Sequence, residues 1–204
     1  MKKIIILLVC FSTHAYQIEK YQEINHKEQV IAIINNDDQD NYFMMIPPQL
    51  SCMERVDFIT ANLLHPRKEF IHIISDNNEV VGLITLTKRQ APSRQYAQQL
   101  KLLGSYYDNY IAMMLADPNL PEQSEKYVVR ATLIIKKNYR NKGYGRKLLL
   151  FAQEQAKQDP EIDEISLDVS DLNTIAIKLY ESLGYKRICH NPIIKKISYK
   201  LSIK

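Results

Sequence analysis

Apolar and polar residues along the chain follow two repeats, one typical of strands and the other of helices. Helical spacing predicts helices that begin near Asn25, Ser51, Arg146 and Asn173. Short runs rich in β-branched residues predict strands at residues 16–24, 70–74, 80–86, 128–135 and 165–169, and closing strands around 188 and at 197–203. The polar stretch 76–79 separates two of these runs and predicts a β-hairpin. We therefore expect one mixed α/β domain over residues 16–204.

The predicted helices carry start and stop signals. Asn25 with Glu28 has the spacing of a capping box, and Ser51 is a second N-cap candidate. The helix after Ser51 is expected to end before Pro66, because proline cannot occupy a helix interior. The helix from Asn173 is followed by a glycine where a left-handed C-cap belongs, Gly184. Its apolar residues are expected to be buried: Ile175, Ala176, Leu179, Tyr180 and Leu183.

Residues 88–125 lie between the predicted hairpin and the predicted strand 128–135, and we interpret them as a helical insertion. Two proline-containing pairs, at 117–118 and 120–121, end its helical pattern. The insertion could cover an acceptor, form the surface of a homodimer, or add a helix to the core. Its apolar residues are spaced three or four apart, as on one face of a helix: Tyr96, Leu100, Leu103, Tyr107, Ile111 and Met114.

The first fifteen residues resemble a short secretory signal peptide. Two lysines precede the apolar run 4–11, and the small residue Ala15 follows. We favour cleavage after Ala15 over the alternative that 4–9 is a first strand. Cleavage would lower the net charge from +4 to +2 and remove Cys10. Cys52 and Cys189 would remain, and we expect two buried free thiols rather than a disulfide. Export to the periplasm or the exterior is expected with cleavage, and a cytoplasmic protein without it.

The composition bounds the class of protein. With 204 residues, 46% hydrophobic and 25% charged, the chain can form one well-buried core. It has no apolar run long enough to span a bilayer. A net charge of +4 suits an anionic ligand but does not by itself indicate nucleic-acid binding.

A glycine loop joins the predicted strand 128–135 to the next helix. Gly143 and Gly145 allow the main chain to approach an anion, and the helix N-terminus adds N–H groups and a positive dipole. Four basic residues surround this position: Arg140, Lys142, Arg146 and Lys147. The pattern predicts a phosphate-bearing ligand. It is neither the nucleotide P-loop, because Gly-Lys-Ser/Thr is missing, nor the dinucleotide fingerprint.

Two blocks together carry a resemblance to a known family. Arg140-Asn141-Lys142-Gly143-Tyr144-Gly145 matches the pattern Arg/Gln-x-x-Gly-x-Gly/Ala, and 168–187 contains Asn173, Ala176, Leu179-Tyr180 and Leu183-Gly184-Tyr185 in order. The chain thus resembles the GCN5-related N-acetyltransferases, the GNAT superfamily. This resemblance implies the acyl-CoA N-acyltransferase fold, a mixed and mostly antiparallel twisted sheet with splayed central strands, flanked by helices. It also implies acetyl-CoA as co-substrate and no metal.

The resemblance assigns residues to the cofactor. Backbone N–H groups around Ile134 and Ile135 would polarise the acetyl carbonyl, and Asn173 would bond the pantetheine arm or cap its helix. The departure at Lys136 and Lys137, where many relatives carry a Pro-Glu-like pair, is expected to change only surface charge. The implied cofactor-binding residues are Leu133, Ile134, Ile135, Arg140, Asn141, Lys142, Gly143, Tyr144, Gly145, Arg146, Asn173 and Tyr180.

Two residues are candidates for catalysis. Tyr180 matches the tyrosine that protonates the leaving thiolate in the superfamily, and a phenol pKa near 10 suits that role; the alternative is a core tyrosine. Asp168 lies in Leu-Asp-Val, where the superfamily's ribosomal-protein alanine acetyltransferases carry Leu-Glu-Val. As a general base it would act through a water; the alternative is a strand carboxylate that faces solvent or pairs with a lysine. Glu125 and Tyr127 are the other candidate bases.

The leading hypothesis is an N-acetyltransferase that moves the acetyl group of acetyl-CoA to a primary amine by direct attack. The acceptor, a small molecule or a protein or peptide, cannot be read from the sequence. The alternative is a catalytically weak CoA-binding or interaction module, because the central strand lacks a glutamate. The third and weakest reading is a basic-aromatic nucleic-acid patch at 136–147.

Overall fold

The computed structural model describes residues 16–35, 50–91, 93–101, 111–112, 115, 121–124, 126–191 and 195–204. The predicted leader, residues 1–15, lies outside this part of the chain, and so does Glu125. Half of the apolar face expected in the insertion lies outside it too, namely Leu103, Tyr107 and Met114. The remaining residues contain the whole predicted glycine loop and both candidate catalytic residues.

A single seven-stranded sheet organises the described chain, in the order β1-β2-β3-β4-β5-β7-β6. Every neighbouring pair is antiparallel except β4 and β5, which are parallel. The predicted mixed, mostly antiparallel sheet is therefore confirmed. The strands are β1 (Tyr16–Lys20), β2 (Ile71–Asp76), β3 (Glu79–Gln90), β4 (Tyr127–Ile135), β5 (Ile162–Ser170), β6 (Lys186–Asn191) and β7 (Lys196–Ser202).

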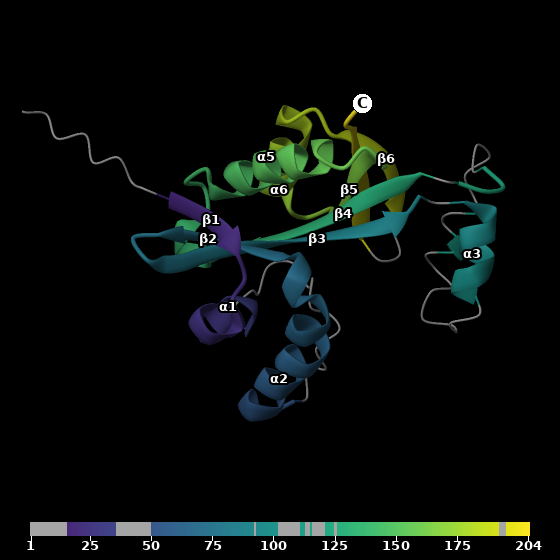
Figure 1. Ribbon diagram of the computed structural model, residues 1–204. Helices are drawn as coiled ribbons and strands as arrows, with labels where there is room; N and C mark the ends of the chain where they lie inside the picture. Colours follow the sequence, from purple (N-terminus) through teal and green to yellow (C-terminus); the bar gives the residue numbers. More distant parts are fainter. Residues whose placement is uncertain are drawn as a thin grey trace, which may run out of the picture.

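Helices cover both faces of the sheet (Figure 1). On one face α1 packs on β3 and β4, and on the other α5 packs on β3, β4 and β5. Each face has its own hydrophobic core. Val80 is buried in the core on the α1 side, and Ile84 is buried in the core on the α5 side. The helical segments are α1 (Glu23–Asn35), α2 (Cys52–Phe58), η1 (Ile59–Leu64), η2 (His65–Phe70), α3 (Arg94–Lys101), η4 (Lys137–Tyr139), α5 (Tyr144–Lys157) and α6 (Thr174–Ser182).

The hairpin between β2 and β3 is where the sequence predicts it. Its two turn residues, Asn77 and Asn78, have φ angles of 50° and 65°. Consecutive left-handed residues match the right-handed twist of a hairpin, and asparagine tolerates this conformation better than most side chains. The segment then continues as a strand to Gln90, so β3 runs into the first residues of the predicted insertion.

One predicted helix start is wrong, and one predicted helix end is confirmed. Helix α1 begins at Glu23, so the first strand ends at Lys20 and the capping box of Asn25 with Glu28 is not formed. The backbone N–H of Gln22 instead donates to Nδ1 of His26 at 3.0 Å, which moves the helix start toward the N-terminus. The helix after Ser51 does end before Pro66, because its last segment, η1, ends at Leu64. Pro66 lies in the first turn of the next segment, η2, where no backbone donor is needed.

Two further helix signals, at Ser51 and Gly184, agree with the structure, whereas the expected burial of the cysteines does not. The Ser51 cap is confirmed as a capping box, since Ser51 and Glu54 each accept a hydrogen bond from the other's backbone N–H. Gly184 has a φ of 84°, which confirms the left-handed C-cap after α6. Cys52 and Cys189 are both free, as expected. Cys52 is exposed in the first turn of α2 and Cys189 is only half-buried, so the expected burial of the two thiols is wrong.

The parallel strands β4 and β5 are paired where both begin and separate toward their C-terminal ends. The two strands pair only from Tyr127 with Ile162 to Arg130 with Ser166. Beyond that point β4 continues to Ile135 against β3, and β5 continues to Ser170 against β7. The backbone groups of β4 that face the parting have no sheet partner on that side. A ligand that enters the gap can therefore bond to the main chain of the central strand.

Among the described residues, no helix combines the length and apolar character that crossing a bilayer requires.

Candidate active site

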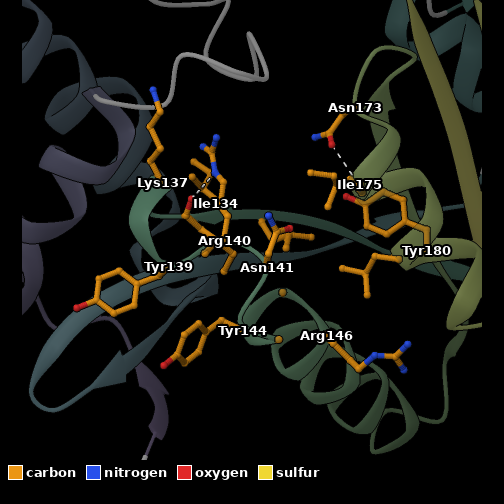
Figure 2. A pocket seen from close by; sticks show the side chains of 16 residues that line it. Ile134, Lys137, Tyr139, Arg140, Asn141, Tyr144, Arg146, Asn173, Ile175 and Tyr180 are labelled. Atoms are coloured by element: carbon orange, nitrogen blue, oxygen red, sulfur yellow. Dashed lines mark hydrogen bonds between the residues drawn. The ribbon is translucent and has the colours of Figure 1, made fainter.

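A cleft of about 440 Å³ opens where β4 and β5 part. Its walls come from the end of β4, the glycine loop, the first turn of α5, and α6 (Figure 2). The cleft brings together eleven of the twelve residues predicted to bind the cofactor: Leu133, Ile134, Ile135, Arg140, Asn141, Gly143, Tyr144, Gly145, Arg146, Asn173 and Tyr180.

The glycine loop is shaped by two left-handed residues. Asn141 has a φ of 62° and Gly143 a φ of 86°, and they turn the chain from β4 into α5. Nε of Arg140 donates to the carbonyl of Ile135 at 3.0 Å, which closes the loop onto the strand end. The first intrahelical bond of α5 runs from the Lys147 N–H to the Gly143 carbonyl at 3.1 Å. The N–H groups of the preceding first turn are therefore available for an anion in the cleft.

Glycine is required at positions 143 and 145 for two different physical reasons. A Cβ at Gly143 would meet nothing within 4 Å, so the positive φ, rather than crowding, requires glycine there. A Cβ at Gly145 would lie 3.3 Å from Cδ2 of Leu179 and 3.6 Å from Cδ1 of Leu133. Any side chain at Gly145 would therefore narrow the cleft between β4 and α6. The loop fits a phosphate-bearing ligand whose apolar part continues between the parted strands.

Two basic residues of the predicted phosphate site act differently from expectation. Lys142 does not line the cleft, because its ammonium lies 4.8 Å from the ring centroid of Tyr139 as a cation–π contact. Arg146 does line it, but its guanidinium donates to Oγ of Ser182 at 2.7 Å. Arg146 therefore joins α5 to α6, and Figure 2 shows its guanidinium directed away from Arg140 and Lys137.

Five further residues line the cleft without having been predicted as cofactor-binding: Lys137, Tyr139, Ile175, Ala176 and Leu179. Lys137 was expected to change only surface charge, yet it extends from η4 along the cleft opposite Asn173 (Figure 2). Ile175 was expected to be buried, yet it is 61% exposed because the first turn of α6 faces the cleft rather than the core. Helical periodicity could not separate a cleft-facing position from a core position.

Tyr180 lies on the wall between two cavities. It is 5% exposed and lines the large cleft, and it also lines a second cavity of about 30 Å³ that contains Asp168. Its ring contacts Tyr199 edge-on at 5.8 Å between centroids and Tyr185 at 6.1 Å. These contacts fix the ring, and Figure 2 shows it directed from α6 into the cleft.

Asp168 faces the second cavity from β5, and both its carboxylate oxygens accept hydrogen bonds. Oδ1 accepts from the hydroxyl of Ser198 on β7 at 2.7 Å, and Oδ2 accepts from the guanidinium of Arg130 on β4. The Asp168 side chain is 21% exposed. The pairing expected as the alternative to a base is therefore present, with an arginine instead of a lysine. The cavity is lined further by Thr132 and Lys196.

Asn173 caps α6. Its side-chain oxygen accepts from the Ala176 N–H at 3.0 Å, so the helix-cap role is confirmed. The nitrogen of the same amide is directed toward the cleft in Figure 2, where it can donate to a ligand. A single side chain thus fixes the start of α6 and offers a polar group to the cleft.

Tyr127, another candidate base, is placed away from both cavities. It is 36% exposed at the start of β4, and the ammonium of Lys88 lies 4.7 Å from its ring centroid. Among the described residues, no cluster of histidine, cysteine and carboxylate side chains could hold a metal ion.

Comparison with known proteins decides the family. The model of the acetyltransferase (GNAT) family matches residues 31–185, most of the chain. The chain belongs to the GNAT family of acetyltransferases. This GNAT chain is 32% identical over 112 residues to the [ribosomal protein bS18]-alanine N-acetyltransferase of Haemophilus ducreyi, an overlap that covers 54% of this chain and 72% of that protein. The expected class of enzyme, an acetyl-CoA-dependent N-acetyltransferase, is confirmed.

Solved structures show the same fold. An N-acetyltransferase from Staphylococcus aureus Mu50 superposes with a TM-score of 0.60 at 16% identity, over 93% of this chain and 99% of that one. A putative acetyltransferase from Salmonella typhimurium, solved with its cofactor acetyl-CoA, superposes with a TM-score of 0.54 at 14% identity, over 93% of this chain and 95% of that one.

Proposed function

We propose that this GNAT protein transfers the acetyl group of acetyl-CoA to a primary amine, and that its acceptor is the α-amino group of a polypeptide that begins with a small residue. The observation that carries the proposal is the position of Tyr180, whose ring borders both the large cleft and the small cavity of Asp168. An acyl donor in the first and an amine in the second would meet beside one phenol.

The large cleft supplies what acetyl-CoA requires. The amides of the glycine loop and of the first turn of α5 would bind the diphosphate, with Lys137 and Arg140 adding positive charge. The parted end of β4, lined by Leu133, Ile134 and Ile135, would hold the pantetheine arm and polarise the acetyl carbonyl through backbone N–H groups.

In the reaction a bond forms from the amine nitrogen to the acetyl carbon, and the bond from that carbon to sulfur breaks. The departing thiolate needs a proton, which the phenol of Tyr180 would donate. The amine must lose a proton, which Asp168 would accept because its carboxylate lines the small cavity that receives the amine. Arg130 and Ser198 would hold the carboxylate in place during this transfer.

The acceptor class follows from the small cavity and from one relative. A space of about 30 Å³ beside Asp168 admits an ammonium group with little attached to it. The curated relative, by its name, acts on an alanine of a ribosomal protein. An α-amino group on a small first residue satisfies both observations.

The test is acetylation of a matched acceptor panel by the full chain, read by mass spectrometry. The panel holds one peptide with N-terminal alanine, the same peptide with N-terminal leucine, the alanine peptide with a blocked N-terminus and an internal lysine, and a small polyamine. We expect the alanine peptide to be acetylated at least tenfold faster than the others. Faster acetylation of the blocked peptide or the polyamine would reject the acceptor class, and no transfer to any acceptor would reject the enzyme activity.

A second candidate function is a CoA-binding module with weak catalysis. The observation that favours it is that both oxygens of Asp168 are already hydrogen-bonded. Asp168→Asn separates the two functions, because the amide cannot accept a proton from the amine. For an active base we expect kcat to fall by about 10²-fold with the KM for acetyl-CoA unchanged, measured with a continuous thiol-release assay.

Asp171→Asn serves as the matched control. Its carboxylate lies in the loop after β5, 3.1 Å from Nε2 of His190, and it does not line either cavity. Equal kcat values for the protein and for Asp168→Asn would remove Asp168 from the mechanism.

A further inference from the structure

The turn between β2 and β3 contacts the glycine loop through a network of tyrosines and carboxylates. The hydroxyl of Tyr139 donates to Oε2 of Glu79 at 2.6 Å, and the ammonium of Lys136 donates to Oε1 of the same carboxylate. The hydroxyl of Tyr144 donates to Oδ2 of Asp76. These five residues, the turn–loop network, join two segments about 60 residues apart in sequence.

The network holds both ends of the loop that lines the cleft. Tyr139 precedes Arg140, and Tyr144 is the first residue of α5, so the two tyrosines bracket residues 140–143. Their rings meet edge-on with centroids 6.0 Å apart. Figure 2 shows both hydroxyls directed away from the cleft, while both residues line it. The backbone between them therefore faces the cleft while the side chains reach back to the turn.

The charges of the network keep its hydrogen bonds formed at neutral pH. The bond to Asp76 raises the pKa of Tyr144 to about 12. The bond to Glu79 raises the pKa of Tyr139, so both phenols keep their protons. The hydrogen bond from Lys136, followed by that from Tyr139, lowers the pKa of Glu79, so this carboxylate stays ionised. Phenol-to-carboxylate bonds are charge-assisted, and the Tyr144–Asp76 bond is buried, with each residue 6% exposed.

The loop needs support of this kind. Asn141 and Gly143 both have positive φ angles, and a non-glycine residue in this region costs free energy unless its surroundings hold it there. An anion binds most tightly to amides that already point at it, because the loop then loses no further freedom on binding. Rigid ends at Tyr139 and Tyr144 supply that order before the ligand arrives.

We propose that Glu79 and Asp76 are positioning residues that set the affinity of the glycine loop for the CoA diphosphate, acting through Tyr139 and Tyr144. This inference rests on the proposed function, because it takes CoA as the ligand of the cleft. Neither carboxylate lines the cleft or the small cavity, so neither touches the reacting groups. The expected signature is therefore a change in binding of the diphosphate part alone.

The test compares the protein with Glu79→Gln and Glu79→Ala. Two acetyl donors are used, acetyl-CoA and S-acetylpantetheine, because only the first carries a diphosphate. For Glu79→Ala we expect the Kd of CoA by calorimetry and the KM of acetyl-CoA to rise about tenfold. Glu79→Gln keeps one oxygen that can accept from Tyr139, so we expect it to lose less affinity than Glu79→Ala. The kcat and the kcat/KM for S-acetylpantetheine are expected to stay unchanged. The matched control is Glu154→Gln, an exposed glutamate of α5 that pairs with Lys157 away from the loop.

Asp76 supplies a second pair of variants. Asp76→Asn keeps an oxygen that can accept from Tyr144 and is expected to bind CoA nearly as the protein does, whereas Asp76→Ala is expected to lose about tenfold. Glu79 is 41% exposed at its side chain, so its variants remain informative even where Asp76→Ala fails to fold.

The outcomes separate this inference from the proposed function. Unchanged CoA binding in Glu79→Ala, or an equal loss with both acetyl donors, overturns the positioning role while the transferase activity stands. Failure of the unaltered protein to bind CoA overturns both. A loss confined to the donor with the diphosphate, absent in Glu154→Gln, supports the role of the turn.

Discussion

Replacing Tyr180 by phenylalanine is expected to lower kcat by about 10²- to 10³-fold while the KM for acetyl-CoA changes by less than about threefold. The substitution removes only the hydroxyl, which we assign to protonation of the leaving thiolate. The ring would keep its edge-on contact with Tyr199 and its place between the two cavities. Steady-state kinetics with a saturating peptide acceptor give both constants.

Tyr199→Phe is the matched control for this experiment. Tyr199 belongs to the same aromatic cluster and is 1% exposed, and its hydroxyl donates to Glu181 at 3.0 Å rather than facing a cavity. A similar fall in kcat in both variants would mean that loss of packing, not of a proton donor, explains the result. Full activity of Tyr180→Phe would show that the thiolate leaves without help from this phenol.

The second large effect is expected from Gly143→Trp, which should weaken acetyl-CoA binding by more than about 10²-fold. Gly143 lines the cleft, and an indole projecting from the loop would occupy the position assigned to the diphosphate. The same change loses the amide geometry that a φ of 86° provides. Calorimetric titration with acetyl-CoA measures the loss directly.

Two smaller substitutions separate bulk from backbone strain. Gly143→Ala carries the strain of a positive φ without the indole, and Gly184→Ala carries the same strain at the end of α6, with its φ of 84°. We expect Gly143→Ala to lose much less affinity than Gly143→Trp, and Gly184→Ala to lose stability but no affinity. Tight binding of acetyl-CoA by Gly143→Trp would place the diphosphate elsewhere.

The fold and the cleft could be predicted because their signals are local. β-branched runs indicate the strands, and the hairpin turn depends on two adjacent residues, Asn77 and Asn78. The glycine loop and the segment from Asn173 to Tyr180 each lie within a dozen residues, and the fold brings both to one cleft. The predicted start of α1 was wrong because two possible N-caps lie close together in the sequence. At Gln22, the side chain of His26 provides the cap and so starts α1 before Asn25.

Contacts between distant strands could not be predicted. Arg130 and Ser198 meet Asp168 only because β5 lies between β4 and β7, an order that no short motif contains. The same holds for Asp76 and Glu79, which reach the glycine loop across the sheet. Lys142 was predicted to bind the cofactor because it lies within the loop motif. In the structure its ammonium contacts the ring of Tyr139 instead.

The parting of β4 from β5 divides the enzyme into two modules. The module of β1 to β4 carries the turn and strand end that shape donor recognition, whereas β5, β7 and α6 carry the carboxylate, its serine partner and the phenol. Only four residue pairs join the two modules along the parallel strands. Exchange of the second module between related enzymes should therefore alter acceptor choice more than donor choice, because α6 forms only one wall of the donor cleft.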